Sequence, residues 1–228
     1  MPVIRDLELQ LSVDQILKAE GVDPAVARER SPLLISIAER AFDTGLPMIE
    51  PVVAYRRLKV KSLKHERVSL EGGGVLSGKL VALHLGPAEQ AVVMVCTIGR
   101  ALESYASAVL RNDPAYGLAL DALGTAAVDA LTTSACRFFG DQGEAEGLRT
   151  TLPISPGMEG WPTARGQGQI FELVNPQEAG IELTVSGMMA PQKSLTLVIG
   201  LGEDVENDGK ICDYCSMRWS CRYQDQYT

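Results

Sequence analysis

Three of the five cysteines lie close together near the end of the sequence. Cys212, Cys215 and Cys221 form the pattern C-x2-C-x5-C. Two thiolates separated by two residues can bind one metal centre from a tight turn, and a third thiolate nearby is typical of zinc and iron–sulfur sites. The spacing therefore predicts a metal centre in this segment. Three ordinary thiols near a chain end are the alternative interpretation.

A four-coordinate centre needs one more ligand from elsewhere in the chain. The candidates are Cys136, Cys96, His65 and His84. We favour Cys136, because it lies in a long helical segment that would then be clamped to the cysteine-rich tail. The odd number of cysteines and their uneven spacing fit thiols or metal ligands better than a disulfide framework.

The helical segment covers residues 116–139, YGLALDALGTAAVDALTTSACRFF. It contains no proline, and alanine, leucine and small residues predict a helix that is packed closely on several sides. Asp129 and Cys136 stand seven residues apart, which at about 100° per residue returns to nearly the same helix face. A carboxylate and a thiol there are either a satisfied core pair or part of a site.

Composition limits the classes of function. The chain has 228 residues, of which 46% are hydrophobic and 5% aromatic, and its net charge is -8. This acidic balance argues against nucleic-acid binding, which needs a basic face. We see no apolar stretch long enough to span a bilayer and no leader sequence, so we expect no membrane partner and a cytoplasmic location.

The remaining elements follow from periodicity and from the positions of glycine and proline. Short helices are expected before residue 45, and strands and tight turns over 61–88. There Gly72, Gly73 and Gly74 indicate a hairpin turn and not a phosphate loop, since no Gly-Lys-Ser/Thr follows. A further helix is expected over 101–113, a charged connection over 140–149, and an irregular stretch from residue 150. Strands are expected over 49–60, 91–96, 169–173, 181–185 and 194–201.

Four stretches resemble the activation domain of cobalamin-dependent methionine synthase: TIGRALESYA, ALGTAAVDAL, SPGMEGWP at 155–162, and SGMMAPQKSLTLVIGLG. The resemblance covers roughly residues 45 to 202. It implies an α+β fold, with a twisted antiparallel sheet and helices around it. We expect one domain over 1–228, divided into N-terminal helices (1–45), the activation-domain-like core (46–202) and the cysteine-rich tail (203–228).

In that family the domain binds S-adenosylmethionine and presents it to a corrinoid for reductive methylation. The resemblance places the ligand site at Asp129, Ser155, Pro156, Gly157 and Met158. Asp129 corresponds there to a glutamate on the central helix, and Met158 to a tyrosine. Cobalamin is the other ligand that the resemblance implies for this surface.

Two further positions depart from the family pattern. Pro153 stands where the family has an arginine that holds the ligand's carboxylate, and Ile199 where it has a ligand-contacting tyrosine. Without the guanidinium, the carboxylate loses a strong bidentate hydrogen bond. The fold is therefore expected to be inherited more faithfully than S-adenosylmethionine binding.

The leading hypothesis is an accessory protein of corrinoid-dependent methyl transfer. Its partner would be a corrinoid protein or a cobalamin-dependent methyltransferase, bound through residues 153–162 and the face near Asp129. A redox centre suits that chemistry, so an iron–sulfur cluster, of the [4Fe-4S] type, is favoured over zinc in the tail. The stretch CDYCSMRWSC also resembles the iron-staple ends of certain bacterial helicase–nucleases. The alternatives are an S-adenosylmethionine-binding enzyme of the methyltransferase type and a scaffold with structural zinc.

Overall fold

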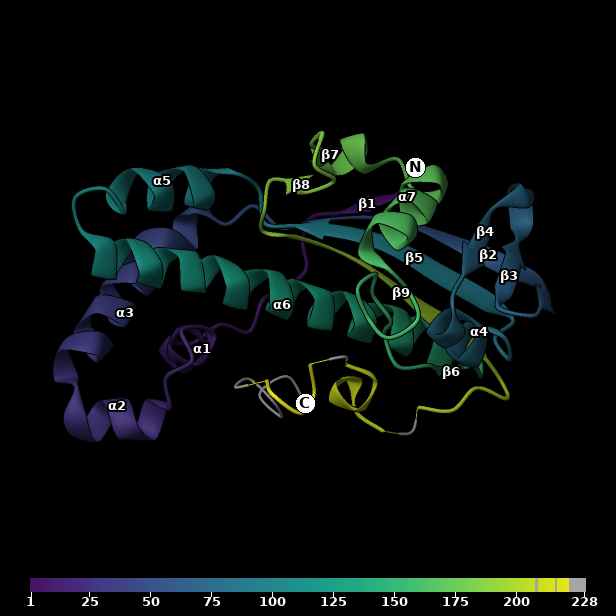
Figure 1. Cartoon of the computed structure of the whole chain (residues 1–228), viewed down its shortest axis with the longest axis horizontal. Helices are drawn as coiled ribbons and strands as arrows, with labels where there is room; N and C mark the ends of the chain where they lie inside the picture. The colour runs from purple at the N-terminus through teal and green to yellow at the C-terminus, as the bar shows by residue number, and fades with distance from the viewer. Residues whose placement is uncertain (208, 216, 222–228) are drawn as a thin grey trace.

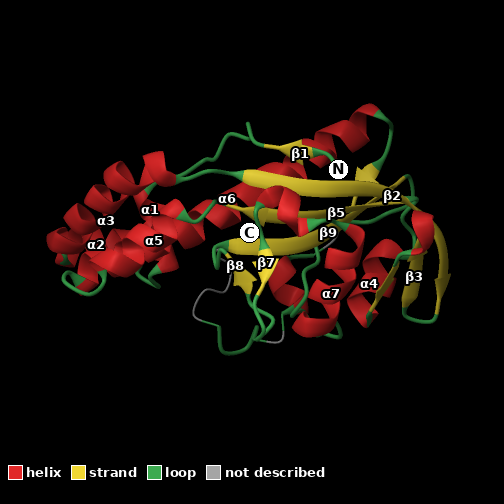
Figure 2. Ribbon diagram, turned by 90° about the horizontal axis from the view of Figure 1, so that it is seen from above, coloured by secondary structure: helices red, strands yellow, loops and turns green. Residues whose placement is uncertain are grey.

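A twisted antiparallel sheet forms the centre of the computed structural model, which describes residues 1–207, 209–215 and 217–221. Among these residues the sheet has seven strands in the order β4-β3-β2-β5-β9-β6, with β1 beside β2 (Figures 1 and 2). The strands are β1 (Val3–Ile4), β2 (Val52–Lys64), β3 (Arg67–Leu70), β4 (Val75–Ser77), β5 (Gln90–Thr97), β6 (Arg149–Thr150) and β9 (Ser194–Gly202). The predicted α+β class with an antiparallel sheet is confirmed.

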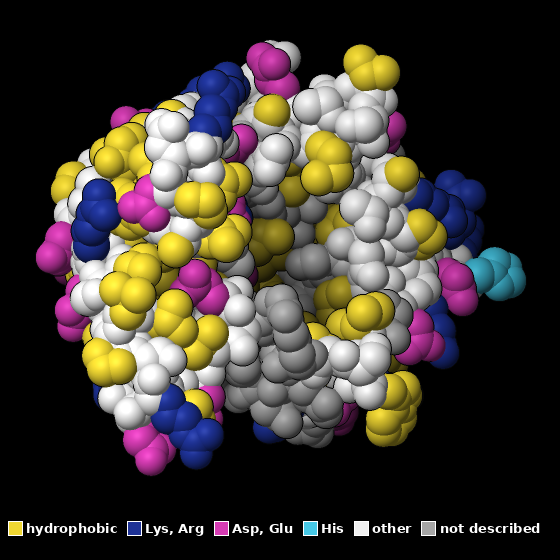
Figure 3. All heavy atoms as spheres, turned by 60° about the vertical axis from the view of Figure 1, so that its left-hand side comes forward, with side chains coloured by type: hydrophobic (Ala, Val, Ile, Leu, Met, Phe, Trp, Pro, Cys, Tyr) yellow, Lys and Arg dark blue, Asp and Glu magenta, His cyan; other side chains and the backbone are white. Residues whose placement is uncertain are grey.

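Helices surround this sheet and also form a separate group at one end of the molecule. They are α1 (Val13–Ala19), α2 (Pro24–Arg30), α3 (Pro32–Gly45), α4 (Lys79–Leu85), α5 (Ala101–Val109), α6 (Pro114–Ala145) and α7 (Thr163–Leu173). Short 3-10 helices are η1 (Leu46–Met48), η2 (Glu71–Gly73), η3 (Pro176–Ala179) and η4 (Ile211–Tyr214), and a small hairpin pairs β7 (Glu182–Leu183) with β8 (Met189–Ala190). Figure 3 shows apolar side chains over much of the left part of one face and a hollow near its centre.

The long helix α6 connects the helical group to the sheet. Figure 1 shows it running from α1, α3 and α5 across to the strands. It begins with Pro114 in its first turn, and the Asp113 carboxylate accepts a hydrogen bond from the Tyr116 amide at 3.3 Å. In the part of the chain that the structure describes, no helix combines the length and the apolar character needed to cross a membrane.

Small residues are buried on several sides of α6, as predicted. They are Gly117, Ala119, Ala122, Gly124, Ala126, Ala127, Ala130, Ala135 and Gly143. A Cβ atom at Gly117 would lie 2.6 Å from the Cα of Leu110, so α5 and α6 approach closely only because this residue is glycine. The helix continues to Ala145, and the connection predicted over 140–149 is therefore mostly helical.

Two hydrophobic cores occupy the two faces of the sheet. Along β5, Val92, Met94 and Cys96 face α6, whereas Val93 and Val95 face the opposite side, because successive strand residues point to opposite faces. The first core also contains residues of α1, α3 and α5. The second is closed by α4, α7 and Trp161, whose side chain is fully buried.

Two predicted strand regions are helical instead. Residues 79–85 form α4, in which the buried residues are Leu80, Val81, His84 and Leu85. Residues 169–173 belong to α7, in which the buried residues are Gly166, Gln167, Ile170 and Leu173. Both sets have the spacing of one helix face, which lies on the second core. The hairpin turn at 72–74 is confirmed, since β3 and β4 pair antiparallel across it.

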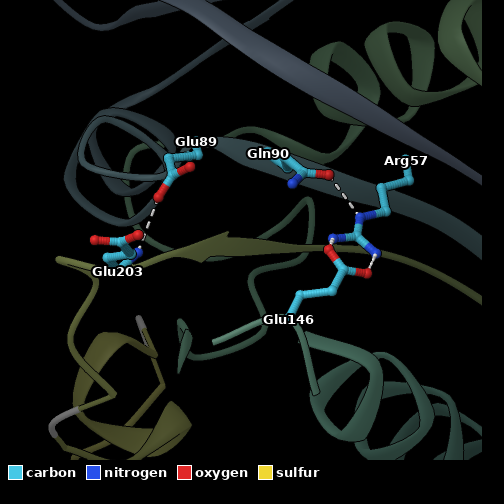
Figure 4. A network of polar contacts seen from close by, with 5 residues as sticks. All are labelled: Arg57, Glu89, Gln90, Glu146 and Glu203. Carbon is cyan, nitrogen blue, oxygen red and sulfur yellow. Dashed lines mark hydrogen bonds and ion pairs between the residues drawn. The ribbon is translucent and has the colours of Figure 1, made fainter. Parts of the chain in front are cut away.

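A polar network ties the end of α6 to the sheet (Figure 4). Arg57 in β2 donates to Gln90 at 2.6 Å and to both carboxylate oxygens of Glu146, one of them at 2.7 Å. These hydrogen bonds lower the pKa of Glu146. Nearby, the amide of Glu203 donates to the carboxylate of Glu89 at 3.0 Å. The network fixes the last turn of α6 against β2 and β5.

The outer edge of β9 is covered over only part of its length. Arg149 and Thr150 in β6 pair with Gly202 and Leu201, and Ile154 forms a single bridge with Val198. From 194 to 197, no strand of the described chain pairs with this edge. The sheet thus remains open beside α6.

Candidate functional site

A hollow of about 540 Å³ lies between the second half of α6 and the end of β9. We call it the α6 hollow. Its helical wall consists of Cys136, Arg137, Gly140, Asp141 and Glu144. The facing residues are Leu148, Arg149, Thr150, Thr151, Pro153, Ile199 and Asn207. The hollow combines an apolar surface with charged groups on both sides.

The α6 hollow brings together positions that are far apart in the sequence. Pro153 and Ile199 are the two places where the resemblance to the activation domain puts a ligand-contacting arginine and tyrosine, and both line this hollow. Cys136, predicted as a metal ligand, lines it as well. The Ile154–Val198 bridge holds the chain after Pro153 against β9. The wall is apolar at both positions, because proline and isoleucine replace the polar residues of the family.

The predicted ligand turn, Ser155 to Met158, is compact and internally bonded. The Ser155 amide donates to the sulfur of Met158 at 3.2 Å, and the Met158 amide donates to the Ser155 carbonyl at 3.2 Å. Gly157 has a φ of +102°, a conformation that favours glycine. The Met158 side chain packs against the second core. The turn is therefore held by its own bonds, and its role toward a ligand stays a prediction.

Trp161 anchors this turn to the rest of the molecule. Its indole Nε1 donates to Gln169 Oε1 at 3.1 Å, and Gln169 Nε2 donates to Ser77 Oγ at 2.6 Å. The Trp161 amide also donates to the carbonyl of Met158 at 3.0 Å. A buried aromatic side chain with a satisfied polar atom fixes the position of the loop.

Asp129 lies on α6 but is not among the residues that line the hollow. It precedes Cys136 by about 10 Å along the helix. Burial raises its pKa from 3.8 to about 6, an effect that the nearby positive charge of Lys193 opposes. Lys193 itself donates to Asp121 and to Thr125, each at 2.9 Å. Asp129, predicted to bind the ligand, and Cys136, predicted to bind a metal, therefore lie at two separate places along α6.

The thiol of Cys136 is partly buried, with its side chain against the first core. Burial raises its pKa to about 12. The pKa of Cys96 in β5 is also raised, first by burial and then by the proximity of Cys136. Both groups are protonated at neutral pH, and a protonated thiol is a poor nucleophile.

The tail passes from the α6 hollow to the predicted ligand turn. Asn207 lines the hollow, and further on the Tyr214 ring packs edge-to-face on His84 with centroids 5.0 Å apart. The Tyr214 carbonyl accepts a hydrogen bond from the Glu159 amide at 3.4 Å. His84 Nε2 is buried and has no hydrogen-bond partner among the described residues, and burial lowers the pKa of this histidine.

The four predicted metal ligands do not meet in this arrangement. Within the residues that the structure describes, no three histidine, cysteine, aspartate or glutamate side chains are placed to hold a metal ion. Cys136 packs on the first core, whereas Tyr214, between Cys212 and Cys215, packs against the second. The metal centre in the tail therefore stays a prediction.

The fold and the hollow define an α+β domain with a small-molecule-sized hollow between its long helix α6 and the end of β9. This is the fold of the crystal structure of the MetH reactivation domain bound to AdoHcy, S-adenosylhomocysteine. The two structures agree with a TM-score of 0.61 at 15% sequence identity, over 94% of this chain and 83% of that one. No protein-family model matches the sequence, and no curated protein matches it.

Proposed function

We propose that this chain is an accessory protein of cobalamin-dependent methyl transfer, and that it binds an S-adenosyl ligand in the α6 hollow. The observation that supports this proposal is that the shared fold and a hollow at the expected ligand positions occur together in this chain. The chain shares its fold with a domain crystallised with AdoHcy, and it has a hollow at Pro153 and Ile199. The family resemblance places ligand-contacting residues at those two positions.

The size and lining of the hollow suit such a ligand. Small-molecule sites are typically about 300–1,000 Å³ and combine apolar walls with a few polar groups. Pro153, Ile199 and Leu148 supply apolar surface, while Thr150 and Thr151 supply hydroxyl groups. An S-adenosyl compound has an aromatic base, a ribose, and an amino acid that carries a negative carboxylate and a positive ammonium group. The apolar surface suits the base, the hydroxyl groups suit the ribose, and the charged side chains of the lining suit the amino acid.

The proposed role is to hold the methyl donor for a partner. In S-adenosylmethionine the methyl group is bonded to a positively charged sulfur; when it leaves, the bonding electron pair stays on sulfur and the product is AdoHcy. The acceptor would be the reduced corrinoid of a corrinoid protein or cobalamin-dependent methyltransferase, with the electron for its reduction coming from an external reductant. The residues of this chain bind and orient the donor.

Calorimetric titration with AdoHcy and S-adenosylmethionine tests the ligand. We expect saturable binding at one site, and at least tenfold weaker binding in Gly140→Met. A Cβ atom at Gly140 meets only Thr150 Cγ2, at 3.8 Å, so a side chain there fills the hollow without strain. Gly168→Met in α7 is the matched control, because nothing lies within 4 Å of its Cβ position. Failure of the wild-type protein to bind either compound at millimolar concentration would contradict the proposed ligand.

A reactivation assay tests the partner. A purified cobalamin-dependent methyltransferase in its inactive cobalt(II) form is mixed with reductant and S-adenosylmethionine, and methylation of the corrinoid is followed by absorption. We expect the rate to depend on the concentration of this protein and to fall in Gly140→Met. A rate that is the same with and without the protein would refute the accessory role.

An iron–sulfur cluster in the tail is a separate proposal, which rests on the spacing of Cys212, Cys215 and Cys221 alone. Among the described residues no such group of ligands is gathered. The test is an absorption spectrum of protein purified without oxygen, with iron, acid-labile sulfide and zinc assayed on the same sample. Iron with sulfide would support the cluster, zinc alone would favour a structural role, and protein free of both would contradict metal binding.

A further inference from the structure

One cation of the α6 hollow has no hydrogen-bond or ion-pair partner among the described residues. Arg137 is the only lysine or arginine in the 32 residues of α6, and it lines the hollow. Its side chain is exposed, and it makes no hydrogen bond or ion pair with any other residue that the structure describes. A lone cation on the wall of a hollow is placed to meet an anion from outside the protein.

The other cations nearby are already engaged. Arg149, which also lines the hollow, donates through Nε at 3.0 Å and through a terminal nitrogen at 2.6 Å to the Glu203 carbonyl. Lys193 lies across Gly124 and is bonded to Asp121. The opposite wall, at Pro153 and Ile199, carries no charge. Arg137 is therefore the cation of the hollow that remains available to a ligand.

Acidic residues on the same wall complete the charge pattern. Asp141 and Glu144 line the hollow about one and two turns beyond Arg137 on α6, and neither forms an ion pair with it. Arg137 can pair with the carboxylate of an α-amino acid, and Asp141 and Glu144 can pair with its ammonium group. A ligand with only one of these charges would leave part of this wall unmatched.

We propose that Arg137 binds the α-carboxylate of an S-adenosyl amino acid in the α6 hollow, an inference that rests on the proposed function. The guanidinium can donate two parallel hydrogen bonds to a carboxylate, which is the strongest form of this contact. Because α6 is a continuous helix packed on the first core, its position is fixed before the ligand arrives. In this chain the cation would thus come from helix α6. The family resemblance instead places an arginine on the loop, at the position of Pro153.

Two ligands that differ only in the amino acid test this proposal. AdoHcy carries the amino acid, whereas 5′-methylthioadenosine has the same adenosine and thioether without it. In calorimetric titrations of Arg137→Gln we expect AdoHcy to bind about 10- to 100-fold more weakly than to the wild type. The affinity for 5′-methylthioadenosine should change less than twofold. A merely structural role of Arg137 would weaken both ligands equally, and that result would overturn the proposal.

Arg111→Gln is the matched control, because this exposed arginine lies just before α6, whose first residue is roughly 35 Å along the helix from Arg137. It should leave both affinities unchanged. If the wild type binds AdoHcy and Arg137→Gln binds it equally well, the role of Arg137 is refuted while the proposed function stands. If the wild type binds 5′-methylthioadenosine but not AdoHcy, the carboxylate contact is refuted directly. If the wild type binds neither, the ligand of the proposed function is refuted first.

Discussion

The two faces of the sheet are covered in different ways. On one face a single helix, α6, crosses the strands with small residues buried along most of its length. On the other face the cover is made of short pieces: α4, α7, the turn before Trp161 and the ring of Tyr214. The first face is covered by one continuous helix, whose backbone hydrogen bonds hold it together. The second face is covered by segments that are distant in sequence and are held together by side-chain contacts.

This difference bears on the α6 hollow, which has one wall of each kind. The helical wall, with Cys136 and Arg137, is fixed by the first core. The facing wall includes Asn207, and the tail beyond it is held at Tyr214 by contacts on the second face. We expect changes to the second core to alter the tail while the helical wall stays in place.

The largest effects are expected from truncating one aromatic residue in each core. Trp161→Ala and Phe139→Ala both remove fully buried side chains and should each lower the free energy of unfolding by about 3–5 kcal/mol. Only Trp161→Ala should release the tail, which limited trypsin digestion would detect as faster cleavage after Arg218. Equal cleavage rates in the two variants would show that the faces do not differ in this way.

Asp129→Asn tests the packing of α6 through the pH dependence of stability. Burial raises the pKa of Asp129 in the folded protein from 3.8 to about 6, so the folded state binds a proton more tightly than the unfolded chain. Stability from this group is therefore present below pH 4 and is lost as the pH rises toward 6. The variant has no ionisable group at this position, so it does not lose this stability over this pH range. Relative to the wild type it should gain about 1–3 kcal/mol between pH 4 and pH 8 in denaturant unfolding. A constant difference between the two pH values would contradict the raised pKa.

Gly117→Ala tests how closely α6 is packed. The new methyl group would meet the Leu110 backbone at 2.6 Å, and backbone cannot move aside as a flexible side chain can. We expect a loss of about 1–3 kcal/mol in the free energy of unfolding, despite the higher helix propensity of alanine. Gly168→Ala in α7, where the Cβ position is open, should instead be neutral or stabilising. Similar values for the two variants would argue against the close approach of α5 and α6.

The smallest effect is expected at the Arg57–Glu146 pair. Hydrogen bonds from Arg57 lower the pKa of Glu146 below 4.5, so their contribution is present above that value and is lost as the pH falls through the lowered pKa. Glu146 is half exposed, and solvent weakens such pairs. Glu146→Gln should be slightly less stable than the wild type at pH 7, with a difference that disappears in acid. Thermal unfolding at both pH values would show this.

The sequence correctly predicted the helices and strands whose local residue pattern favours the same structure as their packing in the fold. The α6 helix was evident because it lacks proline and is rich in alanine, and the strand over 194–201 because its residues are β-branched and apolar. The helices α4 and α7 were missed for a physical reason. In α4 the run LVALHL is apolar except for His84, and in α7 two glycines and several polar residues obscure the helical spacing of Ile170 and Leu173.

The candidate site could be predicted only in part. Resemblance identified Pro153 and Ile199 as altered ligand positions, and the structure places both in one hollow. Arg137 and Asn207 were missed, because no local pattern relates them to that hollow. The one available signal was that Arg137 is the only basic residue of α6. Cys136 was chosen as the fourth metal ligand because it would clamp the central helix to the tail, and that choice stays a prediction.

The open stretch of β9 has a consequence for association between copies of this chain. An unpaired strand edge is a template on which another molecule can add a strand, and proteins often protect such edges with proline and lysine. Here the open stretch begins after Pro191 and Lys193 and ends at the Ile154–Val198 bridge. A second chain would find room for only a few hydrogen bonds. The protein can thus leave this stretch of β9 unpaired without promoting edge-to-edge aggregation.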